Sequence, residues 1–109
     1  MSSSIGNNEE AGSDAIVLEG RPELGEPPKY AVLLHNDDFS TFEFVVEVLK
    51  KFFSKSESEA NQITLEIHHQ GRGIAGVFSC DIAETKVAQV NEYSKSRGFP
   101  LKSSSERVE

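Results

Sequence analysis

Residues 30–53 read YAVLLHNDDFSTFEFVVEVLKKFF, and this stretch decides the fold. Its opening residues, 30–34, are apolar and favour a β-strand, which the turn-forming residues 36–38 bring to an end. Ser40 and Glu43 match a capping box, and the apolar residues after them recur at helical spacing. The stretch therefore predicts a strand, a turn and an amphipathic helix in succession.

Two further helices are predicted by the same signals. Ser56 with Glu59 repeats the capping box, and the helix that it opens stops at Gly71, as helices often do at glycine. Asp81 with Glu84 indicates the N-terminal cap of a third helix. Both helices carry apolar residues on one face, so each is expected to pack against a sheet.

The sequence patterns that predict the other two strands are shorter. Residues 74–79 predict a second strand, and Pro100 with Leu101 begins a weak last strand that frays at residues 103–105. The predicted order is β-α-α-β-α-β. We expect an α+β fold in which three helices pack on a three-stranded antiparallel sheet.

Charge divides the chain into a tail and a body. Residues 1–26 carry six acidic groups and one basic group, with few large apolar residues, and Pro27 and Pro28 follow. Such a composition buries too little surface to offset the entropy of ordering the backbone. We predict a disordered extension over residues 1–28 and one folded domain over residues 29–109. Whether the extension has a function stays open on composition alone.

Composition excludes several classes of function. The chain has 109 residues and a net charge of -7, which disfavours sequence-independent nucleic-acid binding. Its one cysteine, Cys80, excludes an internal disulfide and a multi-thiolate zinc site. The apolar runs are too short to span a membrane, and the first residues do not resemble a signal peptide. We expect a cytoplasmic monomer that binds no membrane.

Polar groups of interest follow the first strand and end the second helix. Asn36 and Asp37 can simply shape a turn, His68 can be a surface residue, and Cys80 can be a small buried hydrophobe. A binding role uses them together: a carboxylate, an amide oxygen and a neutral imidazole can converge on a primary ammonium. Phe42, Ile67 and Leu101 could then line a pocket for the adjacent side chain.

The alternative is a small cysteine- or metal-dependent hydrolase that uses Cys80, His68 and Asp37. Support for it is thin. His68 and His69 are adjacent, so on a helix they diverge by about 100° and cannot both point at one ion. No motif marks Cys80 as an activated thiol, and no cofactor is predicted.

Several segments together resemble a known family. They are YAVLLHNDDFSTFEF, VVEVLKKFF, HHQGRGIAGVFS, IAETKVAQVNEY and PLK, in that order. Over about residues 28–102 the chain resembles the ClpS family of proteolytic adaptors. The resemblance implies a non-enzymatic adaptor of the bacterial N-end rule. It implies binding of proteins that begin with Leu, Phe, Tyr or Trp, and docking on the N-terminal domain of ClpA, the AAA+ unfoldase that feeds the ClpP peptidase.

The resemblance also implies roles for single residues. The substrate α-amino group would be held by Asn36, Asp37 and His68. The first side chain would be surrounded by Ser40, Phe42, Thr64, Ile67 and Leu101. The unfoldase would be contacted by Asp81 and Lys86, and the extension would act during substrate hand-over.

Three positions depart from the family pattern. The family commonly has Met where this chain has Phe42, and an apolar residue, often Met, where it has Thr64. Asp81 replaces the more usual Glu. The first two differences bear on the ranking of first residues, and the third bears on affinity for the unfoldase.

Overall fold

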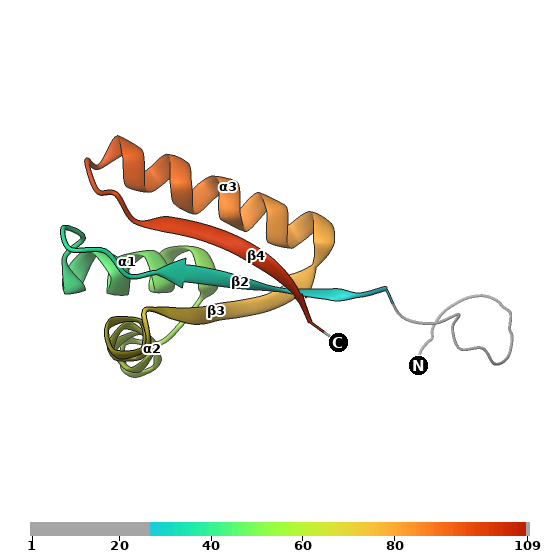
Figure 1. Ribbon diagram of the computed structural model, residues 1–109, viewed down its shortest axis with the longest axis horizontal. Coiled ribbons are helices and arrows are strands. Elements are labelled where there is room, and N and C mark those ends of the chain that lie inside the picture. The colour runs from blue at the N-terminus through green and yellow to red at the C-terminus, as the bar shows by residue number, and fades with distance from the viewer. Residues whose placement is uncertain (1–26, 109) are drawn as a thin grey trace, which may run out of the picture.

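The computed structural model describes residues 27–108. Its elements follow one another as β2 (Lys29–His35), α1 (Phe42–Phe53), α2 (Glu57–Gln70), β3 (Arg72–Ser79), α3 (Cys80–Ser96) and β4 (Lys102–Val108) (Figure 1). The predicted order of strands and helices is confirmed. Of the predicted extension, residues 1–28, the part from residue 1 to residue 26 lies outside the described residues.

The three strands form one antiparallel sheet in the order β3-β2-β4. Among the strands of residues 27–108, the first in sequence, β2, is thus the central one and pairs along its whole length with both neighbours, from Lys29 to His35. The pairing with β3 shifts between Val32 and Leu33, which leaves Ala75 without a direct partner. This bulge keeps Gly73, opposite Leu34, on the same face as the core side chains of β2.

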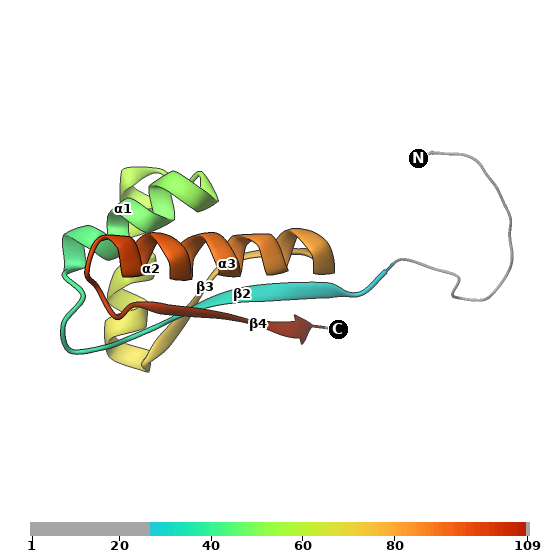
Figure 2. The same cartoon turned by 90° about the horizontal axis from the view of Figure 1, so that it is seen from above.

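The helices pack against the sheet and make the core. In Figure 2, α3 runs along the strands, while α2 reaches from the level of α1 down to the level of the sheet. Val32 and Leu34 of β2 are fully buried together with Val48, Leu49 and other helical side chains. The predicted α+β fold, three helices on a three-stranded antiparallel sheet, is confirmed.

The start of α1 differs from the prediction by one residue. Thr41, not Ser40, is the N-cap, and its Oγ1 accepts a hydrogen bond from the Phe44 amide at 3.0 Å. The Ser40 amide instead donates to Asp37 Oδ1 at 2.7 Å, which holds Ser40 in the preceding loop. Asp37 thus keeps Ser40 in the loop, and Thr41 provides the side chain that caps the helix.

The second helix follows its sequence signals, whereas the third does not. Ser56 and Glu59 form the predicted capping box, and α2 ends at Gly71. The predicted cap at Asp81 is wrong: α3 begins at Cys80 with Ser79 as N-cap, directly after β3. Asp81 lies in the first turn, where its negative charge favours the helix dipole.

The last strand is longer and better paired than predicted. It does not fray at the serines but runs from Lys102 to Val108 against β2. The Asn91 side chain bonds both the amide and the carbonyl of Ser103, at 2.8 and 3.2 Å, and Ser103 Oγ donates to the Leu33 carbonyl. These long-range bonds outweigh the weak strand propensity of serine. The second strand likewise begins earlier than predicted, at Arg72.

Lys86 links the third helix to the end of the first. Its half-buried Nζ donates to the Phe52 carbonyl at 2.7 Å and lies 5.9 Å from the ring centres of both Phe53 and Phe78. The contact satisfies a carbonyl in the last turn of α1, where a positive charge also favours the helix dipole.

We therefore expect Lys86→Met to lower the free energy of unfolding by about 1.5–3 kcal/mol, the usual contribution of a hydrogen bond to a charged group. Urea denaturation measures the loss. Lys95→Met, at an exposed position of the same helix, serves as the control and should change stability by less than about 0.5 kcal/mol. Equal effects of the two substitutions would contradict a structural role for the Lys86 contact.

Candidate functional site

The loop after β2 is shaped by one carboxylate. Asp37 Oδ1 accepts hydrogen bonds from the amides of Phe39 at 2.8 Å and Ser40 at 2.7 Å. These bonds fix the orientation of the carboxylate. Its other oxygen, Oδ2, is buried and makes no hydrogen bond, and the same holds for the Ser40 hydroxyl oxygen. A buried acceptor without a donor is costly, so this loop is prepared for a group that supplies N–H donors.

The end of α2 is tied to the same loop. Gly71 adopts the left-handed conformation at φ 91°, its amide donates to the Ile67 carbonyl, and its own carbonyl accepts from the Asn36 amide at 2.9 Å. The bond joins the first residue after β2 to the residue that ends the helix. His68, in the last turn of α2, is thereby brought close to Asn36 and Asp37.

A pocket of about 350 Å³ lies between this loop, α1 and α2. Seven of the predicted site residues line it: Asn36, Asp37, Ser40, Phe42, Thr64, Ile67 and His68. Its polar groups come from the loop and from the end of α2, and its apolar walls come from the helices. The arrangement can hold a ligand that carries a cation with N–H donors next to an apolar side chain.

Leu101 does not line this pocket. It is buried in the same core cluster as Val45 and Ile67, but it borders a separate hollow between α3 and β4. The predicted set of site residues left out Asp38, Val45 and Leu65, which do line the pocket, although Asp38 belongs to the polar segment that the sequence pointed to. Val45 could have been found, because it lies one helical turn after Phe42. Leu65 lies off the apolar stripe of α2 and is 48% exposed, so periodicity gave no sign of it.

The surroundings of the Asp37 carboxyl lower its pKa. Partial burial raises its pKa, but the adjacent Ser40 hydroxyl and the amides of Ser40 and Phe39 together lower the pKa further, to below the usual value for aspartate. The hydroxyl acts here through its dipole, because it makes no well-aligned hydrogen bond. The pocket therefore keeps a negative charge at its polar end across the neutral and mildly acidic range.

Thr64 contributes room rather than an extra donor. Its hydroxyl donates to the Ala60 carbonyl at 2.7 Å, within the same helix, so the proton is not available to a ligand. The side chain is 4% exposed and lines the pocket. Compared with a longer apolar residue, it leaves more volume between α1 and α2.

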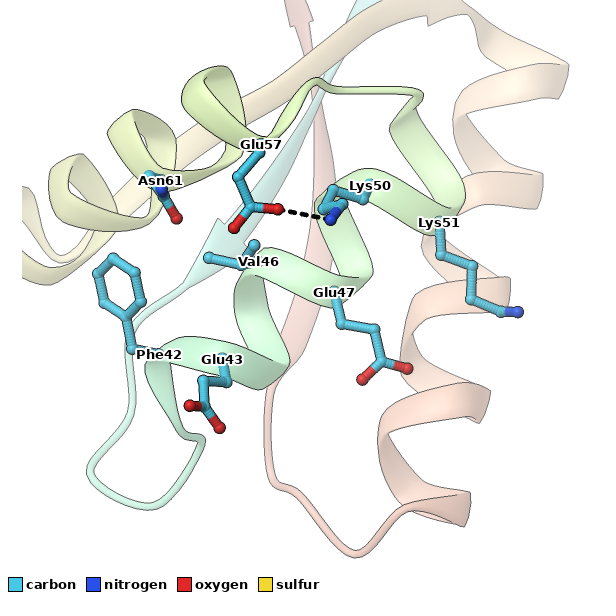
Figure 3. Close-up of a pocket in the computed structure, with 8 residues that line it drawn as sticks. All are labelled: Phe42, Glu43, Val46, Glu47, Lys50, Lys51, Glu57 and Asn61. Atoms are coloured by element: carbon cyan, nitrogen blue, oxygen red, sulfur yellow. Dashed lines mark hydrogen bonds and ion pairs between the residues drawn. The ribbon is translucent and has the colours of Figure 1, made fainter.

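Phe42 separates this pocket from a second hollow. The second hollow, of about 570 Å³, lies between α1 and α2 (Figure 3), and the Phe42 ring borders both spaces. In Figure 3 the ring points toward α2 and Asn61, while the Lys50–Glu57 ion pair, at 2.5 Å, joins the two helices farther along. Phe42 is 45% exposed, so its ring stands at the pocket mouth with space on either side.

The family model and the relatives that match this chain carry the same family name. The sequence model of a family described as "ATP-dependent Clp protease adaptor protein ClpS" matches residues 25–104. Two relatives named ATP-dependent Clp protease adapter protein ClpS are similar over 86 residues, or 79% of this chain. The protein from Shewanella loihica is 54% identical, and the match covers 84% of its length. The protein from Xanthomonas oryzae pv. oryzae is 49% identical, and the match covers 81% of its length. The chain belongs to the ClpS family.

A solved structure agrees with the family assignment. Agrobacterium tumefaciens ClpS2 bound to L-phenylalaninamide matches this chain with a TM-score of 0.74 at 37% identity, over 76% of this chain and 100% of that one. Members of the ClpS family are adaptors of the Clp protease and not enzymes. The hydrolase alternative is therefore wrong for this ClpS chain.

The geometry around the cysteine fits that conclusion. Burial and the neighbouring carboxylates of Glu84 and Asp81 raise the pKa of the Cys80 thiol, which disfavours the reactive thiolate. Cys80 opens α3 and does not line the pocket that contains His68.

Within residues 27–108, no group of His, Cys, Asp and Glu side chains is placed to hold a metal ion, and no helix has the length and apolarity to cross a bilayer.

The Ser40 hydroxyl gives a test of the electrostatics in this ClpS chain. We expect Ser40→Ala to raise the pKa of Asp37, because one of the groups that lower it is removed. A lowered pKa contributes stability that is complete above the unfolded value of about 3.9 and is lost as pH falls through the folded value, so the variant should lose stability at higher pH during acid unfolding. Carboxyl NMR titration measures the shift.

Ser58→Ala is the matched control, since Ser58 is exposed on α2 and does not line the pocket. It should leave the Asp37 titration unchanged. If the two alanine variants titrated alike, the contribution assigned to the Ser40 side chain would be wrong.

Proposed function

We propose that this ClpS adaptor acts in the cytoplasm, as a monomer, by binding proteins through a large hydrophobic first residue and its free α-amino group. The first residue would be Leu, Phe, Tyr or Trp. The adaptor would then deliver the bound protein to the AAA+ unfoldase ClpA of the ClpAP protease. It has two contact regions in this proposal, one for the substrate terminus and one for the unfoldase.

The unpaired, buried Asp37 Oδ2 at the polar end of an apolar pocket carries the proposal. A primary ammonium has three N–H donors, and the Asp37 carboxylate, the Asn36 side chain and the His68 imidazole supply acceptors around it. Each charge-assisted bond contributes about 1.5–3 kcal/mol. Capture of an N-terminal amine in this way is a known mode of peptide recognition.

The pocket's size supports a single large side chain as the ligand. Its volume of about 350 Å³ is near the lower end of ligand pockets, which run from roughly 300 to 1,000 Å³. The similar Agrobacterium protein was solved with L-phenylalaninamide, a ligand that combines an aromatic side chain with an amine. Phe42, Val45 and Ile67 would surround the side chain here.

The proposal is tested by fluorescence anisotropy with labelled peptides that begin with Phe and carry a free or an acetylated amine. We expect the free peptide to bind near micromolar, about -8 kcal/mol, and the acetylated peptide not to bind. Acetylation removes both the charge and the donors that Asp37 Oδ2 lacks. Equal binding of the two peptides would refute amine capture.

A matched pair of variants locates the charge. Asp37→Asn keeps an oxygen that can accept from the two loop amides but removes the negative charge, so affinity should fall by about 10- to 100-fold. Asp38→Asn, at an exposed position on the same pocket, should cost less than about fivefold because water and salt screen that carboxylate. Similar losses in both variants would argue against a specific role for Asp37.

The imidazole of His68 is the acceptor that the second helix contributes to the proposed amine site. His68→Ala should weaken binding of the free-amine Phe peptide by about tenfold or more, because one acceptor for the ammonium is lost. His69→Ala, at the neighbouring residue that does not line the pocket, should leave the affinity unchanged. Equal losses in the two variants would contradict the role assigned to His68.

The region proposed for the unfoldase lies at the other end of the sheet. Asp81 and the half-exposed Ile82 are in the first turn of α3, just after β3 ends opposite Lys29, whereas the pocket adjoins the far end of β2. Substrate and unfoldase could thus be bound at once. Lys86 is held against α1, so it would contribute mainly by fixing α3.

Reversal of the charge at Asp81 tests this assignment. Asp81→Arg should weaken binding to the isolated N-terminal domain of ClpA, measured by calorimetry, and leave affinity for the Phe peptide unchanged. Glu92→Arg, a charge reversal on an exposed residue farther along α3, is the control. If the Asp81→Arg and Glu92→Arg variants bound the ClpA domain equally well, the assignment of the start of α3 as the unfoldase contact would be wrong.

A further inference from the structure

Ile67 forms a wall of the pocket with a glycine behind it. The Ile67 side chain lines the pocket and is 2% exposed, while Gly73 of β3 lies against it and does not line the pocket. Gly73 is buried and pairs with Leu34 on the sheet face that carries the core. The Ile67 side chain thus contacts both the pocket and the backbone of β3 at Gly73.

Space, not backbone conformation, accounts for glycine at this position. A Cβ on Gly73 would stand 2.8 Å from Ile67 Cγ1, closer than real Cβ atoms approach, and 3.7 Å from Ile67 Cδ1. The φ angle of Gly73 is not positive, unlike that of Gly71 and Gly98. Any side chain at residue 73 would therefore have to displace Ile67.

The clash at this position falls on Ile67 alone. The Ile63 carbonyl oxygen would lie 3.6 Å from the same Cβ position, which is an ordinary van der Waals contact. The core around Ile67 is closely packed with buried side chains, whereas the pocket on its other side is open. The added methyl group would push the Ile67 side chain into the pocket.

We propose that Gly73 sets the depth of the pocket and thereby the preference of this adaptor for aromatic over aliphatic first residues. The inference rests on the proposed function, because it concerns the same pocket. The absence of a side chain at residue 73 lets Ile67 sit back, and Thr64 leaves further room nearby. The largest side chains, Trp and Phe, need that depth most, and Leu needs it least.

A second glycine on the same strand provides a matched control. A Cβ on Gly76 would be equally crowded, at 2.7 Å from the Phe78 ring and 3.7 Å from Phe53. Neither phenylalanine lines the pocket. Gly76→Ala therefore disturbs β3 and the core to a similar degree without moving a pocket wall.

The experiment measures affinities of the full chain for free-amine peptides that begin with Trp, Phe or Leu. We expect Gly73→Ala to weaken Trp and Phe binding by about tenfold or more, and Leu binding by less than about threefold, in line with the effect of one methyl group in an apolar pocket. Gly76→Ala should keep the wild-type ratio of Trp to Leu affinity. Gly73→Ala with Ile67→Val should recover most of the aromatic binding, because the shortened side chain returns volume to the pocket.

Equal losses for all three peptides in Gly73→Ala, or the same change of ratio in Gly76→Ala, would overturn the inference. If circular dichroism shows that Gly73→Ala does not fold, Ile67→Val alone decides: it should raise the ratio of Trp to Leu affinity, and an unchanged ratio would overturn the inference. Wild-type protein that binds none of the peptides would overturn the proposed function itself. Binding by wild type with an unaltered ratio in the variants would overturn only the role of Gly73.

Discussion

The hydrogen bond from the Asn36 amide to the Gly71 carbonyl is the constraint on which the site depends. It joins the end of the central strand to the end of the second helix, although the two residues are 35 positions apart in the sequence. Only a left-handed residue at 71 ends α2 while aiming its carbonyl at the loop, and glycine adopts that conformation without strain. The carboxylate of Asp37 and the imidazole of His68 meet because of this bond.

The same loop contains buried polar atoms without hydrogen-bond partners. Asp37 uses one oxygen to hold the turn and leaves the other buried and unpaired, and the Ser40 hydroxyl beside it is unpaired as well. Unsatisfied buried groups weaken a fold, and native proteins retain them mostly where a ligand or a reaction needs them. The cost is borne by a loop between two well-anchored elements, which keep the acceptors in place.

Much of this could be predicted from local sequence, and the rest depended on contacts between distant residues. The order of elements and the Ser56 cap followed from short motifs and periodicity. The grouping of Asn36, Asp37 and His68 came from the resemblance to the ClpS family, because spacing alone only made it possible. The start of α1 did not follow from local sequence, because Asp37 Oδ1 holds the Ser40 amide in the loop and Thr41 caps the helix instead. The extent of β4 did not, because Asn91 and Leu33 bond its serines from other elements. Leu65 was missed because it is exposed and lies outside the apolar stripe of its helix. Leu101 was expected at the pocket, whereas its side chain is buried in the core.

The antiparallel pairing of β2 with β4 has a practical consequence. Lys29 and Val108, near the two ends of the described chain, pair with each other. Lys29 lies six residues from His35, at the pocket end of β2, a length of roughly 20 Å. The two ends are therefore close enough for a short peptide to join them in a circularly permuted chain, with new termini opened elsewhere. An attachment made beside Lys29 or Val108 would lie about one strand length from the pocket, so the domain is suited to oriented immobilisation with the pocket left exposed.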